Sequence, residues 1–217
     1  MRDKSFTALH AEVQRLHRSW VHYKRLFEPS STRAESAPAL LDAWRTLDLL
    51  RWPLLRGVAI DICRLTDQSK QGSQQNLTLR RVLEEWEPVL AGNQDLAELL
   101  ERSVREVHEI AAKPNGLRTL RNKALSHCDF DTAVGVVPSA SVAIADLGRA
   151  VELIVRFRDL IAGARQGLPL DPQASGARQS SRDARDWSEE AQRLLATVLA
   201  GLRAAGQEPP AEWNAAE

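Results

Sequence analysis

The sequence predicts an all-α protein, a helical bundle followed by a helical extension. Apolar residues recur at alternating spacings of three and four along most of the chain, which places them on one side of successive helices. Stretches rich in proline, glycine and serine separate these segments, as loops do. With 217 residues, 43% of them hydrophobic, the chain is long enough to bury one ordinary core. We therefore expect one main domain.

The first two predicted helices carry the longest apolar stripes. In the first, one face holds Phe6, Leu9, Val13, Leu16, Trp20, Tyr23 and Phe27. The loop "EPSSTRAESAP" follows, and a second helix covers about residues 38–66, with a broader face of Leu40, Trp44, Leu47, Leu50, Leu54, Val58, Ile62 and Leu65. Pro53 lies inside this second helix, so we expect a kink near Arg51.

The next two predicted helices are shorter. After the polar surface loop "DQSKQGSQQN", Thr78 is placed to cap a helix that runs to about Trp86, with Leu77 and Val82 at the positions of a hydrophobic staple. A fourth helix covers about residues 95–112, where "KPNG" breaks it.

Two further helices complete the predicted domain. Pro114 fits the first turn of a short helix that ends near Ser126. A loop at 129–139 contains "AVGVV", which could be extended, and Ser139 or Ser141 then opens a helix to about Arg165. Its apolar stripe is Val142, Leu147, Val151, Ile154, Phe157 and Ile161.

The composition changes after this helix. We predict a domain at 1–166, a linker at 167–183 with the sequence "GLPLDPQASGARQSSRD", an amphipathic helix at 184–206 and a tail at 207–217. The last helix is built on Trp187, Ala191, Leu194, Val198 and Leu202. We expect it to dock on its own domain or on a dimer mate; the alternative is that it binds another protein.

Charge and cysteine content limit the function classes. Lys plus Arg equals Asp plus Glu at 29 each, so any contact with nucleic acid must be local. Cys63 and Cys128 are too few for a disulfide framework and lack the spacing of a zinc site, and we expect reduced thiols. "MRDKSF" leads into a charged amphipathic stretch instead of a signal peptide, and no apolar run approaches the roughly 20 residues of a membrane span. These features favour a cytoplasmic protein.

The stretch "LRTLRNKALSHCDFD" contains the main candidate site. Arg121 is a fork-shaped cation of the kind that binds phosphate in two places, and Asn122 can donate or accept beside it. His127 would extend the apolar stripe at the last turn of its helix, where terminal carbonyls raise a histidine pKa and suit it to acid–base work. On a continuous helix Arg121 and His127 differ by about 120° in direction. A capped helix end with one hydrogen-bonded core histidine remains the alternative.

Four blocks in this order resemble the AbiU-type branch of the HEPN superfamily, named for higher eukaryotes and prokaryotes nucleotide-binding domains. They are "YKRLFE", "DICRLTD", "NLTLRRVLE" and "LRNKALSHCD", and the resemblance covers about residues 4–165. The superfamily motif, an arginine followed by a polar residue and then by a histidine four to six positions after the arginine, matches Arg121, Asn122 and His127.

The resemblance implies an all-helical HEPN-like bundle and a metal-independent endoribonuclease. Such an enzyme would act in phage defence by abortive infection or as a toxin, with two subunits joining their motifs in one cleft of a homodimer. Arg121, Asn122 and His127 would be catalytic, Asp129 would support them, and Arg118 and Lys123 would bind the RNA. The alternative is a catalytically silent HEPN module that binds RNA, a nucleotide or a protein partner as a regulator.

The block "DICRLTD" offers further supporting residues. Asp61, Arg64 and Asp67 lie at spacings of three, which allows an ion-pair ladder on one helix face. Either this ladder orients the polar loop, or one carboxylate positions Arg121 or His127. Asp61 is favoured for the second role because its apolar neighbours suggest a partly buried site, where a carboxylate needs a cation; Arg64 is one candidate cation.

Two other interpretations carry little weight. His10 and His17 lie two turns apart, about 10 Å, too far to hold one ion alone, and His22 does not complete a set. A thiol-protease site at Cys128 and His127 fails because neighbouring side chains point in different directions and no oxyanion loop is recognisable. We expect no metal and no cofactor.

Overall fold

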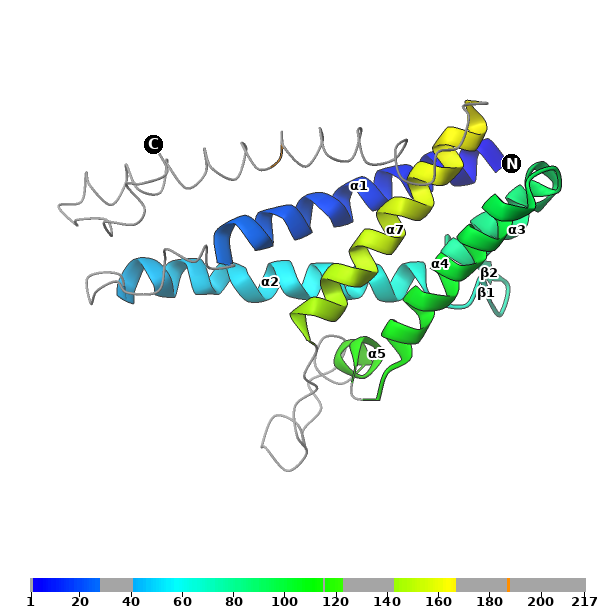
Figure 1. Cartoon of the computed structure of the whole chain (residues 1–217). Coiled ribbons are helices and arrows are strands. Elements are labelled where there is room, and N and C mark those ends of the chain that lie inside the picture. Colours follow the sequence, from blue (N-terminus) through cyan, green and yellow to red (C-terminus); the bar gives the residue numbers. More distant parts are fainter. Residues whose placement is uncertain (1, 28–40, 115, 123–142, 167–186, 188–217) are drawn as a thin grey trace.

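The computed structural model describes residues 2–27, 41–114, 116–122, 143–166 and 187 (Figure 1). In these residues the chain forms six helices and one two-stranded hairpin, which confirms the predicted all-α class. The elements are α1 (Arg2–Phe27), α2 (Leu41–Leu65), β1 (Lys70–Gln71), β2 (Gln74–Gln75), α3 (Leu79–Leu90), α4 (Gln94–Ala112), α5 (Leu117–Leu120) and α7 (Ile144–Arg165).

Two antiparallel helix pairs build the bundle. Helices α1 and α2 lie side by side, and α7 crosses them with α4 running antiparallel alongside it (Figure 1). Helix α3 packs on α4 and α1, and α5 lies between the ends of α2 and α4. None of the helices in the described ranges is long and apolar enough to cross a membrane.

The predicted stripe of α1 is the centre of the core. Leu9, Val13 and Leu16 are fully buried, Phe6, Trp20 and Tyr23 are almost fully buried, and Phe27 packs partly buried against them. The rings of Trp20 and Tyr23 stack with centroids 5.5 Å apart. Burial of side chains of this size contributes about 1.5–3 kcal/mol each, so this stripe fixes α1 against α2, α3 and α7.

Helix α3 confirms one prediction and corrects another. Thr78 caps it as predicted, since its hydroxyl accepts from the amide of Arg81 at 3.2 Å. The helix was expected to end near Trp86, but it continues through Pro88 to Leu90. Proline removes only one backbone donor near a helix end, and burial of Leu90 together with the bond from the Ala91 amide to the Glu87 carbonyl sustains the last turn.

The short helix α5 also differs from its prediction. Pro114 was expected inside its first turn, but the helix begins after Gly116, and Arg121 and Asn122 follow in a wider π-helical turn. A Cβ atom at position 116 would lie 2.8 Å from the Lys113 carbonyl oxygen, so the tight turn there requires glycine. The predicted continuation to Ser126 lies outside the described residues.

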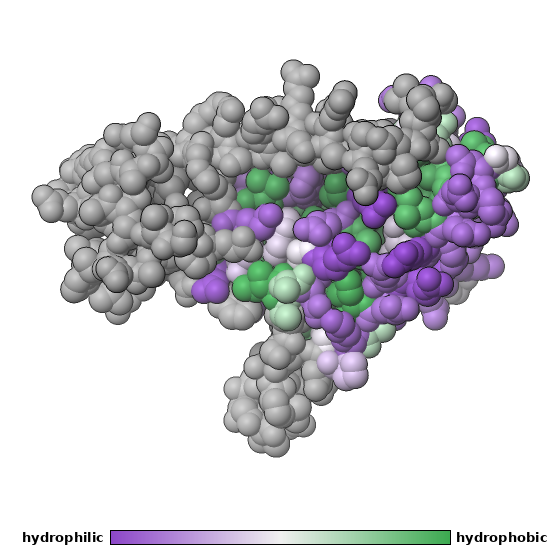
Figure 2. All heavy atoms as spheres, in the orientation of Figure 1, coloured by the Kyte–Doolittle hydropathy of each residue, from purple (hydrophilic) through white to green (hydrophobic). Residues whose placement is uncertain are grey.

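The exposed face of α4 and α7 is hydrophilic (Figure 2). Across it Arg149 of α7 donates to Glu106 of α4 at 3.0 Å, and Arg102 donates to the same carboxylate at 2.9 Å. These hydrogen bonds lower the pKa of Glu106. At the other end of α4, Lys113 lies 2.7 Å from Asp146 of α7.

Two helical glycines allow a matched test of this packing. A Cβ atom at Gly148 would lie 2.9 Å from Cζ2 of the buried Trp20, whereas one at Gly57 would meet nothing within 4 Å. We expect Gly57→Ala to raise the free energy of unfolding by about 0.5–1 kcal/mol through helix propensity. Gly148→Ala should lower it by about 1 kcal/mol, because overpacking outweighs that gain. Urea denaturation measures both, and stabilisation by Gly148→Ala would contradict the close contact of α1 and α7.

Candidate functional site

The candidate site forms where α5 meets the end of α2. Helix α5 has only four residues and leads directly into Arg121 and Asn122. Buried Leu117 anchors it in the core. A helix this short is not stable in isolation, so its position depends on contacts with the rest of the bundle.

Arg121 is bound to Asp67, which lies in the turn after α2. Its Nη1 donates to both carboxylate oxygens of Asp67 at 2.7 Å, and its Nε donates to Oδ1 of Asn122 at 3.1 Å. The side chain of Arg121 is 25% exposed and that of Asp67 is 32% exposed. The hydrogen bond to Asp67 raises the pKa of Arg121 above its ordinary value. Among the described residues no acceptor is bound to Nη2.

Arg118 holds the end of α2 itself. Its Nη2 donates to the carbonyl oxygen of Thr66 at 2.8 Å, and the Thr66 hydroxyl donates back to the carbonyls of Ile62 and Cys63 at 2.9 and 3.2 Å. Cations stabilise the unpaired carbonyls at a helix C-terminus. Nε of Arg118 is buried, and the predicted contact of Arg118 with RNA stays a prediction.

Asp61 binds Arg15 of α1, a partner that the sequence analysis did not name. Its carboxylate accepts from Arg15 of α1 at 2.8 and 3.4 Å and lies 3.5 Å from Arg64. The predicted need for a cation is met, partly by Arg64 as anticipated. Hydrogen bonding to Asp61 raises the pKa of Arg15. The structure thus places Asp67, and not the favoured Asp61, against Arg121.

Cys63 of α2 is fully buried and in the free state. Burial raises its thiol pKa to about 11, although the positive charge of Arg121 partly opposes this. The thiol is therefore protonated at neutral pH and behaves as a small apolar side chain.

Sequence reasoning missed His108 of α4. Burial lowers its pKa, and the positive charges of Arg118 and Arg80 lower it further. Its Nε2 is buried without a hydrogen-bond partner among the described residues. His108 stands one turn after the buried Val104, so a histidine at the edge of an apolar stripe was the only available signal.

Three predicted site residues lie outside the described residues: His127, Asp129 and Lys123. Their geometry relative to Arg121 stays a prediction, as does the state of Cys128. Within the described ranges no three His, Cys, Asp or Glu side chains gather as a metal site. The ring of His17 instead lies edge-on to Trp187, with centroids 5.0 Å apart.

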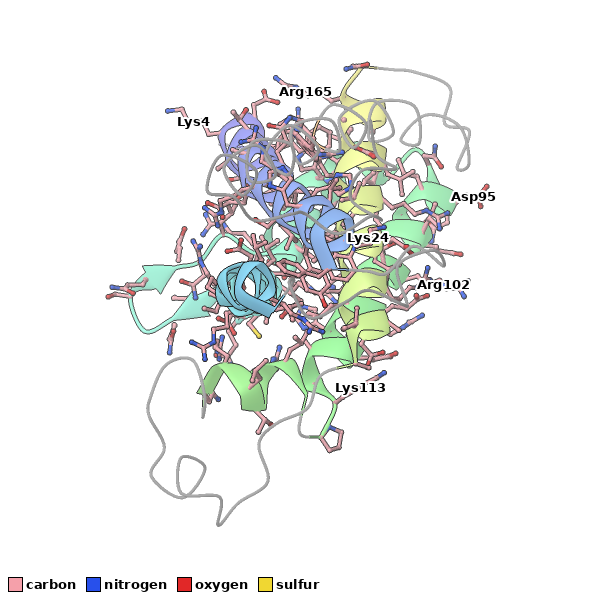
Figure 3. All side chains as sticks on the ribbon, turned by 90° about the vertical axis from the view of Figure 1, so that its left-hand side faces the viewer. Lys4, Lys24, Asp95, Arg102, Lys113 and Arg165 are labelled. Atoms are coloured by element: carbon pink, nitrogen blue, oxygen red, sulfur yellow. The ribbon has the colours of Figure 1, made fainter. Side chains whose placement is uncertain are left out.

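One pocket lies next to the site, and a larger groove lies away from it. A pocket of about 180 Å³ lies beside Asp67, lined also by Glu12, Arg64 and Leu65. A larger groove of about 690 Å³ lies between α3 and α4. It is on the side where Asp95 and Arg102 project, away from the end of α2 (Figure 3). Four glutamates and three arginines line that groove, which gives it no attraction for phosphate.

Comparison with known proteins yields one family. No curated protein and no solved structure matches the chain. The HEPN family AbiU2 matches residues 3–198. The match continues past residue 166 through the predicted linker and into the predicted C-terminal helix. The Arg121–Asn122 pair at the end of α2 therefore sits in a recognised domain, and the chain belongs to the AbiU2 family of HEPN-domain proteins.

Proposed function

We propose that this protein is a metal-independent endoribonuclease that cleaves single-stranded or loop RNA and acts in phage defence or as a toxin. The observation that carries the proposal is the partly buried Arg121, which Asp67 orients and whose Nη2 is bound to no described residue. An oriented arginine at a partly buried position suits the stabilisation of charge that develops on a phosphate. Membership of an HEPN family supports this interpretation.

The chemistry follows from the residue types. His127 would take the proton of a ribose 2′-hydroxyl, and the 2′-oxygen would attack the adjacent phosphorus. The bond from phosphorus to the 5′-oxygen of the next nucleotide then breaks, and that oxygen takes a proton from water or from the imidazolium formed at His127. Arg121 would stabilise the added negative charge in between, with Asn122 holding Nε. The upstream product carries a 2′,3′-cyclic phosphate. Unpaired RNA is the expected substrate because its 2′-hydroxyls and bases are accessible.

A silent binding module is the second candidate function. Asp67 engages Nη1 of Arg121 with both oxygens, and a purely structural arginine would be held in the same way. Such a module would bind RNA, a nucleotide or a protein partner, an antitoxin among them, without cleaving.

Cleavage assays on purified protein test the enzymatic proposal. His127→Ala should abolish cleavage at every pH while leaving RNA binding nearly intact. Arg121→Lys keeps the charge but loses the fork, and should cost about 2–4 kcal/mol of transition-state stabilisation; Asn122→Ala should be milder. Cleavage should persist in excess EDTA. An EDTA-sensitive activity, or one that survives His127→Ala, would exclude the mechanism, and a wild type inactive on every RNA would favour the silent module.

Neutralising Asp67 distinguishes a positioning carboxylate from a structural one. Asp67→Asn should lower kcat by about tenfold or more, because Arg121 loses its orientation, while KM for RNA falls as a negative charge is removed. Loss of a partly buried ion pair should cost about 1 kcal/mol of stability. Glu85→Gln is the matched control, since Glu85 is a half-buried carboxylate 3.0 Å from Arg81 on α3. Equal effects of both variants on kcat would leave Asp67 with a structural role only.

A composite site requires two copies of the chain. We expect light scattering to show a homodimer at micromolar concentration, formed through the segments next to Arg121. Mixing inactive Arg121→Ala with inactive His127→Ala protein should restore part of the activity if each cleft uses residues of both subunits. A strict monomer with full activity would overturn the composite arrangement.

A further inference from the structure

The pocket beside Asp67 has the composition of a binding site for one planar base. Its apolar part is Leu65, which is 3% exposed, together with the half-buried Leu77. Its volume is about 180 Å³. A cavity of about 150 Å³ holds benzene, so this open pocket can take one heterocycle with its edge toward the rim.

The pocket and the proposed phosphate position share one residue. Asp67 lines the pocket and also binds Arg121 through both carboxylate oxygens. A phosphate on Nη2 of Arg121 and a base in the pocket would therefore be neighbours along one RNA strand. The pocket is formed before any ligand binds, because α1, the end of α2 and the loop after β2 all contribute to it.

The hairpin side of the pocket is held rigidly. Strands β1 and β2 pair Lys70 with Gln75 and Gln71 with Gln74, and Gly72 turns between them at a φ of 62°. Asn76 closes the loop through Nδ2, which donates to the Gln68 carbonyl at 2.9 Å. Asn76 and the exposed Gln71 both line the pocket, and their side-chain amides supply donors and acceptors for a base edge.

The rim presents a carboxylate and a guanidinium at neighbouring positions. Glu12 lies 3.7 Å from Nη1 of Arg64, and the two side chains are 27% and 56% exposed. Glu12 also pairs with Arg15, with 2.5 Å between Oε2 and Nη2. A carboxylate has about four acceptor sites, so Glu12 retains capacity for a ligand. Among the described residues the ion pairs of Arg64 are both long, 3.7 Å to Glu12 and 3.5 Å to Asp61, and Arg64 lines the pocket.

These donors and acceptors match one nucleobase best. Guanine presents N1–H and an exocyclic amine, which a carboxylate accepts, and it presents O6 and N7, which arginine binds bidentately. Adenine and cytosine lack the ring N–H that would face Glu12, and uracil lacks the exocyclic amine. We propose that the pocket of Glu12, Arg64 and Leu65 binds an unpaired guanine next to the phosphate held by Arg121. This proposal rests on the RNA-cleaving function proposed above for Arg121.

Cleavage mapping tests the proposal on the working enzyme. Single-stranded oligonucleotides that differ at one position, with guanine, adenine, cytosine or uracil there, are incubated with the full chain. Wild type should cut next to guanine about tenfold faster than next to the other bases. Glu12→Gln and Arg64→Gln should each reduce that preference severalfold, because each slows cleavage next to guanine more than cleavage next to the other bases. Arg102→Gln is the matched control, because Arg102 is an ion-paired arginine on the opposite side, and it should keep the wild-type preference.

Nucleotide binding gives a readout that does not need cleavage. Calorimetric titration with the four 5′-monophosphates and with inorganic phosphate separates base from phosphate. Guanosine monophosphate should bind about tenfold more tightly than the other three, and Glu12→Gln and Arg64→Gln should remove the difference. Melting temperatures close to wild type show that each variant is folded. Glu12→Gln also removes an ion pair with Arg15. If that variant does not fold, the result for Arg64→Gln decides the test.

The two readouts separate the possible failures. A guanine preference in binding that depends on Glu12 and Arg64, without any RNA cleavage, would retain the pocket assignment and reject the ribonuclease. Cleavage whose base preference is absent, or is unchanged in both variants, would reject the pocket assignment and retain the ribonuclease. Equal binding of all four nucleotides with no cleavage would overturn both.

Discussion

The junction between α5 and the end of α2 fixes everything that the candidate site can do. Two arginines make this junction: Arg118 binds the Thr66 carbonyl and Arg121 binds Asp67. Terminal carbonyls and a carboxylate place partial and full negative charge at the same point, which attracts both cations. With Leu117 buried as an anchor, these contacts hold a four-residue helix that could not persist alone. The π-helical turn at Arg121 and Asn122 then directs the guanidinium toward Asp67 and away from the bundle axis.

The ion pair with Asp67 orients Arg121 but weakens the attraction of Arg121 for a phosphate. Asp67 compensates most of the charge of Arg121, so an approaching phosphate gains less Coulomb energy than it would from a lone guanidinium. In return Arg121 needs little reorganisation when charge develops on the phosphate, and preorganised donors in a partly desolvated site contribute most to catalysis. The thiol of Cys63, close enough to feel the charges of both side chains, is itself buried, and burial raises its pKa to about 11. Low solvation strengthens electrostatic interactions at such a position.

The fold was predictable from the sequence because it depends on local periodicity, whereas the site depends on distant contacts. The stripe of α1 and the cap at Thr78 are patterns within one helix, and the structure confirms them. Arg121 and Asp67 are separated by 54 positions, and no spacing rule links them. Asp61 was favoured because its apolar neighbours suggested a partly buried site, and the ladder that joined it to Asp67 assumed a continuous helix, but α2 ends at Leu65. Asp67 therefore lies in the following turn, where it can reach α5, while Asp61 stays on the α2 face that contacts Arg15.

The charge distribution explains why recognition must be local. With a net charge of zero, the chain has no long-range attraction for a polyanion, and few phosphate contacts give weak, shallowly salt-dependent binding. Around the junction four arginines, Arg15, Arg64, Arg118 and Arg121, are opposed by three carboxylates, Glu12, Asp61 and Asp67. If the protein acts on RNA as proposed, this near-neutrality means that the RNA backbone alone contributes little affinity. Discrimination between RNAs would then come from base contacts, for which the proposed base pocket shares Asp67 with Arg121.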